Sequence, residues 1–140
     1  VKLALEDRDR LDDKTVLVTG ANRGLGLAVA LDVARRGARV ILACRSGLAD
    51  AVLEVKRASR RESVEGLALD LGDLGSVERA AEELASRGLT LDVAILNAGI
   101  VPREARRTKD GFDESFQVNF LSNVLLVGRL LERGLAVVRG

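Results

Sequence analysis

Short apolar runs alternate with helix-length amphipathic stretches along most of the chain. The apolar runs, rich in valine, leucine and isoleucine, lie at residues 15–19, 38–43, 64–69, 91–96 and 135–138. Stretches with apolar residues every three or four positions lie between them, at residues 24–36, from Leu48, after Asp73 and at about 110–133. Continuous apolar runs are typical of strands buried on both faces, and their alternation with helices favours a parallel sheet. The sequence therefore predicts an α/β fold, a doubly wound parallel sheet of five strands alternating with four helices.

The spacing of apolar residues also predicts which helix faces are buried. Asp73 is a plausible N-cap of the third helix. The residues expected to face inward in that helix are Leu74, Val77, Ala81 and Leu84. In the last helix, those spaced for burial are Phe112, Phe116, Val124, Val127 and Leu131. Both sets follow the period of an amphipathic helix.

The length and charge of the chain limit the classes of protein to which it can belong. A chain of 140 residues is long enough for one domain, and no repeat or Pro/Ser-rich linker divides it. The 22 basic and 21 acidic side chains leave a net charge of +1, which gives no overall field for nucleic acid or an anionic membrane. No run of 18 apolar residues is present, and the first ten residues are too charged for a signal peptide. We expect a cytoplasmic protein with neither nucleic acid nor a membrane as partner.

Several residue types are missing. The chain has no His, Tyr, Trp or Met and only one Cys, Cys44. A Ser-His-Asp or Cys-His nucleophile is thereby excluded, no internal disulfide can form, and no metal site is expected. Cys44 is interpreted as a small residue at the edge of the core. Because the chain opens at Val1, we expect a processed, trimmed or partial chain.

A glycine-rich turn between the first strand and the first helix is the most informative segment. It reads Thr19-Gly20-Ala21-Asn22-Arg23-Gly24-Leu25-Gly26. Glycines let the backbone turn tightly and approach a ligand, and the following helix directs free N–H groups and its positive dipole end at the same place. This combination predicts a phosphate or pyrophosphate site, although the glycines could instead serve only the turn. A P-loop is excluded because no Gly-Lys-Ser/Thr follows.

The spacing T-G-x-x-x-G-x-G and three later motifs resemble the short-chain dehydrogenase/reductase family. Asp70-Leu71 ends the third strand, Asn97-Ala98-Gly99 ends the fourth, and Asn119 lies in the last helix, each where the family has a landmark. The segments Ala43-Cys44-Arg45 and Asp110-Gly111-Phe112 look most like the retinol-dehydrogenase-like branch. The resemblance extends from about Lys14 to Leu131, which corresponds to the N-terminal part of such a protein.

The resemblance implies a Rossmann-type NAD(P)-binding domain with strand order 3-2-1-4-5 and assigns a role to each motif. The residues implied at the pyrophosphate end of the cofactor are Gly20, Arg23, Gly24, Leu25 and Gly26, and Thr19 and Asn22 in the same turn are also expected to bind the cofactor. Asp70 and Leu71 are implied to contact adenine, and Asn97, Ala98 and Gly99 to lie on the ribose side. Asn119 is the counterpart of the family's catalytic asparagine.

The cofactor expected from these residues is NADP(H) in preference to NAD(H). An acidic residue at the tip of the second strand favours NAD, but residues 43–46 contain none. Arg45, with Arg23 in the glycine turn, can bond a 2′-phosphate. The alternative is that both are solvated surface arginines.

The family's catalytic Tyr and Lys have no counterparts in this chain. We therefore expect residues 1–140 to be a single domain that is incomplete on its C-terminal side. The function implied by the resemblance is interconversion of a small-molecule alcohol and carbonyl by the full-length protein, while this chain alone is expected to be inactive. The alternative is a non-catalytic dinucleotide-binding or dimerisation module. A homodimer through the helix at 110–133, with Phe120, Leu121 and Leu125 in contact, is a further expectation.

Overall fold

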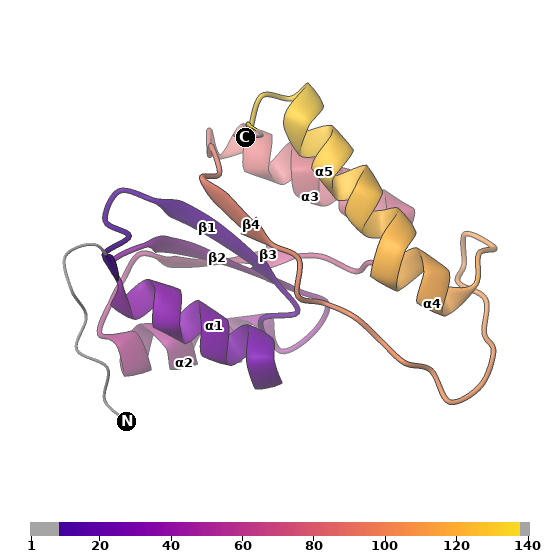
Figure 1. Cartoon of the computed structure of the whole chain (residues 1–140), viewed down its shortest axis with the longest axis horizontal. Coiled ribbons are helices and arrows are strands. Elements are labelled where there is room, and N and C mark those ends of the chain that lie inside the picture. The colour runs from indigo at the N-terminus through magenta and orange to yellow at the C-terminus, as the bar shows by residue number, and fades with distance from the viewer. Residues whose placement is uncertain (1–8, 138–140) are drawn as a thin grey trace.

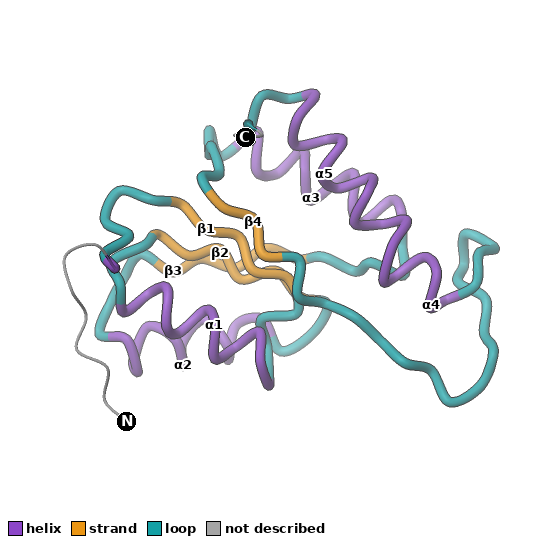
Figure 2. The backbone as a smooth tube through the Cα atoms, in the orientation of Figure 1, coloured by secondary structure: helices purple, strands orange, loops and turns teal. Residues whose placement is uncertain are grey.

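The computed structural model describes residues 9–137. The elements in chain order are β1 (Thr15–Thr19), α1 (Gly24–Arg35), β2 (Arg39–Cys44), α2 (Leu48–Ser59), β3 (Val64–Ala68), α3 (Leu74–Ser86), β4 (Val93–Ile95), α4 (Glu114–Phe116), the π-helical segment η2 (Gln117–Leu121) and α5 (Ser122–Glu132) (Figures 1 and 2). The predicted alternation is confirmed for the first four strands and for all the helices.

The strands form a parallel sheet in the order β3-β2-β1-β4. β1 lies between β2 and β4, so that Val16 is opposite both Val40 and Val93. Helices α1 and α2 cover one face, and α3 and α5 cover the other (Figure 1). This is the doubly wound architecture that the sequence predicts, and the four strands follow the predicted order.

The core has two layers because successive side chains of a strand point to opposite faces of the sheet. Val16 and Val18 pack among the buried residues of α1 and α2. Leu17, between them in sequence, packs instead with residues of α3 and α5. All three side chains are at most 1% exposed, as expected for a strand covered on both sides.

The last helix differs from the prediction in its start and in its buried face. It begins at Glu114 rather than near 110, and its inward residues are Gln117, Ser122, Leu126 and Leu130. Phe112, Phe116, Val124 and Leu131, expected inside, are between 41% and 53% exposed. Because of the wider π turn, Ser122 comes five residues after Gln117, and both of these inward residues are polar. A prediction from the spacing of apolar residues therefore assigns the wrong face of this helix to the core.

The C-terminal edge of the sheet also differs from the prediction. β4 has only three residues and hydrogen-bonds within the sheet only to β1 among the described strands. Val93 and Leu96 are 42% and 39% exposed. Of the predicted strand at 135–138, residues 135–137 are not in a strand, and Val138 lies outside the described residues. Leu135 instead accepts a hydrogen bond from the N–H of Leu91 through its carbonyl, at 2.6 Å.

None of the helices between residues 9 and 137 combines the length and apolar character needed to cross a bilayer.

Candidate functional site

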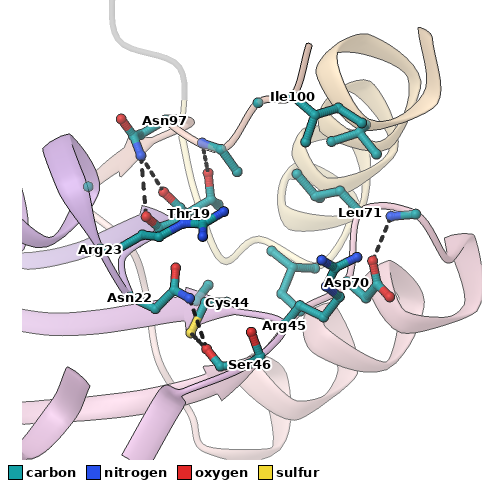
Figure 3. Close-up of a pocket in the computed structure, with 18 of the residues that line it drawn as sticks. Thr19, Asn22, Arg23, Cys44, Arg45, Ser46, Asp70, Leu71, Asn97 and Ile100 are labelled. Carbon is teal, nitrogen blue, oxygen red and sulfur yellow. Dashed lines mark hydrogen bonds between the residues drawn. The ribbon is translucent and has the colours of Figure 1, made fainter. Parts of the chain in front are cut away.

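A cleft of about 740 Å³ lies at the carboxyl ends of the four strands. All thirteen residues predicted to contact a cofactor line it: Thr19, Gly20, Asn22, Arg23, Gly24, Leu25, Gly26, Arg45, Asp70, Leu71, Asn97, Ala98 and Gly99. They come from four separate segments of the chain, each at or just after the carboxyl end of a strand (Figure 3). In open α/β sheets this edge is where ligands bind.

The glycine turn has a conformation that other residues would disturb. Gly20 and Gly24 have φ angles of +64° and +54°, in the left-handed region. A Cβ on Gly26 would lie 2.2 Å from the Gly20 carbonyl oxygen, so this position has no space for a side chain. A Cβ on Gly24, in contrast, meets no atom within 4 Å. The turn is therefore tightly packed inside and open on its cleft side.

The N-terminus of α1 opens into this cleft. Its N-cap residue, Arg23, makes no side-chain cap, and its first turn contains no acidic residue. The N–H groups at the start of a helix have no partner within the helix, and they carry the positive end of its dipole. The arrangement favours an anion beside Gly24 and Leu25.

Asn97 connects the ends of β1 and β4. Its Nδ2 donates to the carbonyl oxygens of Thr19 at 3.1 Å and of Gly20 at 3.5 Å. The Ala98 N–H donates to the buried Thr19 hydroxyl at 3.0 Å. The side chains of Thr19 and Asn97 thus hold the glycine turn in place. The backbone of the turn faces the cleft (Figure 3).

The tip of β2 carries Arg45, which is exposed and has no side-chain hydrogen bond or ion pair within residues 9–137. The neighbouring Cys44 thiol donates to the Ser46 carbonyl at 3.3 Å, and burial raises the pKa of that thiol. Asn22 Nδ2 donates to the same carbonyl at 3.1 Å and so joins the glycine turn to the end of β2.

Asp70 and Leu71 follow β3 and form a further wall of the cleft. Asp70 Oδ1 accepts from the Gly72 N–H at 2.8 Å, and the Ser76 hydroxyl is 2.9 Å from the Asp70 N–H. The Leu71 carbonyl accepts from Gln117 and Ser122 at 3.3 and 2.6 Å, which links this wall to the last helix.

Asn119 does not line the cleft. Its side chain makes a paired contact with the backbone of Ile100: Nδ2 donates to the Ile100 carbonyl and Oδ1 accepts from the Ile100 N–H, both at 2.8 Å. Nδ2 also lies 3.1 Å from the Ser115 hydroxyl. In this structure Asn119 fixes the chain just after β4, where that chain borders the cleft.

The loop between β4 and α4 forms a part of the cleft that the sequence did not predict. The additional residues on this side are Ile100, Val101, Pro102, Arg103, Arg106, Glu114 and Val118. The signal that could have identified them is the concentration of arginine in a loop that leaves the carboxyl edge of a strand. No group of three or more metal-ligating side chains gathers anywhere between residues 9 and 137.

A glycine turn that joins the central strand to a helix, at the carboxyl edge of a doubly wound parallel sheet, places this chain in the Rossmann class of nucleotide-binding proteins. Residues 14–136 match the model of the short chain dehydrogenase family. The chain belongs to that family, whose members are oxidoreductases that bind NAD(P) and act on small molecules.

Individual relatives agree with this assignment. Retinol dehydrogenase 12 of Mus musculus is 39% identical over 126 residues, which cover 89% of this chain and 40% of the relative. The WW domain-containing oxidoreductase of Gallus gallus is 41% identical over 130 residues, which cover 91% and 31%. The chain thus spans well under half the length of these relatives.

Solved structures show the same fold. An uncharacterised protein of Mycobacterium paratuberculosis superimposes with a TM-score of 0.72 and 39% identity, over 89% of this chain and 44% of that protein. A short chain dehydrogenase of Escherichia coli CFT073, solved with NADPH, gives a TM-score of 0.74 and 28% identity, over 89% and 55%.

Proposed function

We propose that this chain binds NADP(H) in the cleft and forms the cofactor-binding part of an oxidoreductase that interconverts an alcohol and a carbonyl. The observation that carries the proposal is the convergence of all thirteen predicted cofactor residues, from four segments, on one cleft. The NADPH complex of the related Escherichia coli enzyme supports it.

The pyrophosphate is proposed to lie against the start of α1. The N–H groups of Gly24 and Leu25 and the helix dipole favour an anion there, and the open space beside Gly24 leaves room for it. Asp70 and Leu71, at the end of β3, are proposed to border the adenine. Ala98 and Gly99 are proposed to border the ribose of the other half of the cofactor.

Arg45 and Arg23 are proposed to select NADP(H) over NAD(H). Both line the cleft, and neither side chain has a hydrogen bond or ion pair within the described part of the chain. Each is therefore available for a charge-assisted bond to a 2′-phosphate, and no carboxylate at residues 43–46 repels that phosphate.

Asn119 is proposed to act as a positioning residue through Ile100. The nicotinamide supplies the hydride when the cofactor is bound. Family members with a catalytic Tyr use its phenol for proton transfer, whereas these 140 residues contain no Tyr. We expect this polypeptide by itself to bind NADPH without oxidising it in the presence of aldehydes or ketones.

The test is a titration with NADPH and NADH followed by nicotinamide fluorescence. We expect NADPH to bind about tenfold more tightly, the worth of one charge-assisted bond. Arg45→Asp should reverse the order, while Arg57→Asp, at the far end of α2, should not. Tighter binding of NADH by the unmodified chain would contradict the cofactor preference, and binding of neither would contradict the function.

A second proposal, that the last helix pairs with a second copy of the chain, rests on an aromatic stripe. All three phenylalanines, Phe112, Phe116 and Phe120, lie in a row with ring centroids 6.4 and 5.6 Å apart, and they are 41–58% exposed. Exposed aromatic rows of this kind mark interaction surfaces. Sedimentation should show a dimer that Phe116→Ser with Phe120→Ser dissociates. A monomer at all concentrations would refute the pairing.

A further inference from the structure

The three arginines of the loop between β4 and α4 differ in their contacts and in their position relative to the cleft. Arg107 donates to the Gly111 carbonyl at 2.7 Å and does not line the cleft. Arg103 and Arg106 do line the cleft, are exposed, and make no side-chain hydrogen bond or ion pair with any residue between 9 and 137. The two arginines that face the cleft are therefore the two available to a ligand.

The loop is fastened on both sides of these arginines. Before them, Ile100 is held by the two hydrogen bonds to Asn119. After them, the Thr108 hydroxyl is 2.5 Å from Gln117 Oε1, and Gln117 Nε2 donates to Asp110 at 2.9 Å. Asp110 also accepts from the first N–H of α3 at 2.9 Å. Residues 101–107 thus form a short span between anchored points, where two side chains can be presented to the cleft at a lower entropic cost than in a loose loop.

The cleft carries its positive charge in two separate places. Its lining contains four arginines and two carboxylates, those of Asp70 and Glu114. Arg23 and Arg45 follow β1 and β2, whereas Arg103 and Arg106 follow β4, which lies on the other side of β1 from β2. The loop leaves the carboxyl edge and runs outward before it returns to α4 (Figure 1). If the first pair serves the cofactor, the second pair remains for another anion.

We propose that Arg103 and Arg106 bind a carboxylate or phosphate group of the substrate, so that this site takes an anionic carbonyl or alcohol compound. The inference deepens the proposed function and rests on it. Arginine suits such a group because its planar guanidinium donates two parallel hydrogen bonds to two oxygens. Ile100, Val101 and Val118 line the same side of the cleft and provide an apolar surface for the body of that compound.

The test compares two aldehydes that differ in one charge. The carboxylate 4-formylbenzoate and its methyl ester are titrated calorimetrically into the full chain saturated with NADP+. We expect the carboxylate to bind about tenfold more tightly than the ester, as one charge-assisted interaction allows. The double variant Arg103→Gln with Arg106→Gln should abolish that preference.

The matched control is Arg57→Gln with Arg60→Gln, which removes the same charge at the end of α2 away from the cleft. It should retain the preference. Equal binding of acid and ester to the unmodified chain, or a preference that survives Arg103→Gln with Arg106→Gln, would overturn the inference.

The NADP+ affinity of each variant separates this inference from the proposed function. We expect it to change by less than about twofold in the Arg103/Arg106 variant. A loss of NADP+ affinity as large as the loss of carboxylate affinity would assign these arginines to the cofactor and overturn the inference alone. Failure of the unmodified chain to bind NADP+ would overturn the proposed function, and this inference with it.

Discussion

Gly26 shows at the scale of one residue why the glycine turn tolerates so little change. A Cβ at this position would lie 2.2 Å from the Gly20 carbonyl oxygen and 2.5 Å from Asn97 Nδ2. Both are parts of the contact that joins β1 to β4 through Asn97. A methyl group here therefore moves the turn away from the strand that supports it.

We predict that Gly26→Ala lowers NADPH affinity by at least about tenfold and destabilises the fold by about 1–3 kcal/mol, as overpacking does. Gly128→Ala in α5 is the matched control, because a Cβ there meets no atom within 4 Å and φ is not positive. It should leave binding unchanged and raise helix stability slightly. Fluorescence titration and urea unfolding of the two variants check this, and equal effects in both would refute the packing argument.

The sequence was informative at the residue scale where a backbone conformation demands one residue type. Gly20, Gly24 and Gly26 could be identified because positive φ angles and a close backbone approach require glycine. Asn119 could be identified as important, but not as the partner of Ile100, since 19 residues separate them in sequence. Arg103 and Arg106 could be singled out as a basic cluster in the loop after the fourth strand, but they could not be placed in the cleft, because no local rule indicates the direction in which a loop leaves the sheet.

Among the helices and strands, the π-helical segment η2 has the greatest effect on the cleft. It begins at Gln117, a fully buried polar residue, and ends before Ser122, which is also buried. Both side chains donate to the Leu71 carbonyl at the cleft wall. The last helix is therefore attached to the cleft by polar contacts and not only by apolar packing.

We predict that Gln117→Leu destabilises the chain by about 1–3 kcal/mol, because it removes three hydrogen bonds and leaves the buried Leu71 carbonyl, the half-buried Thr108 hydroxyl and Asp110 each without one partner. Val124→Ser, 53% exposed on the same helical unit, should change stability by less than about 0.5 kcal/mol. Urea unfolding measures both. The opposite order of the two effects would show that the polar attachment contributes little.

The prediction of helices and strands succeeded where the buried face is clearly apolar. It failed where the buried face carries both polar and apolar residues. The runs around β1 and β2 are almost wholly buried, so both strands agree with the prediction to within one residue. The last helix buries Gln117 and Ser122 and exposes Phe116 and Phe120, which is the reverse of what hydrophobic periodicity assumes. A π turn leaves no signature in the apolar pattern, so its shift of register could not be foreseen.

At the scale of the whole molecule, ion pairs link the loop after β4 to α3. Asp73 accepts from Lys109, in that loop, at 2.8 Å and from Arg79, in α3, at 3.1 Å. The hydrogen bond from Lys109, then that from the Ser76 backbone and then that from Arg79 lower the pKa of Asp73 to about 2. A carboxyl with a lowered pKa in the folded state stabilises that state above its unfolded pKa, near 4, and this stabilisation is lost as the pH falls through the folded value.

We predict that Asp73→Asn is less stable than the unmodified chain at pH 7 and that the difference shrinks between pH 4 and about 2, where Asp73 becomes protonated. The midpoints of urea unfolding at pH 7, 4 and 2 provide the measurement. A difference in midpoint that stays constant over this range would contradict the assignment of the lowered pKa to these contacts.

The central claim for the whole molecule is that a dinucleotide binds across the carboxyl edge of the sheet. The most direct measurement is a 1H–15N correlation spectrum of the chain with and without NADP+. We expect the largest shifts to fall on backbone amides at Gly24, Leu25, Arg45 and Gly99, around the cleft. We expect little change along the outer face of α2, for example at Leu53, which is 58% exposed. No shifts at saturating NADP+, or shifts centred away from the glycine turn, would contradict the claim.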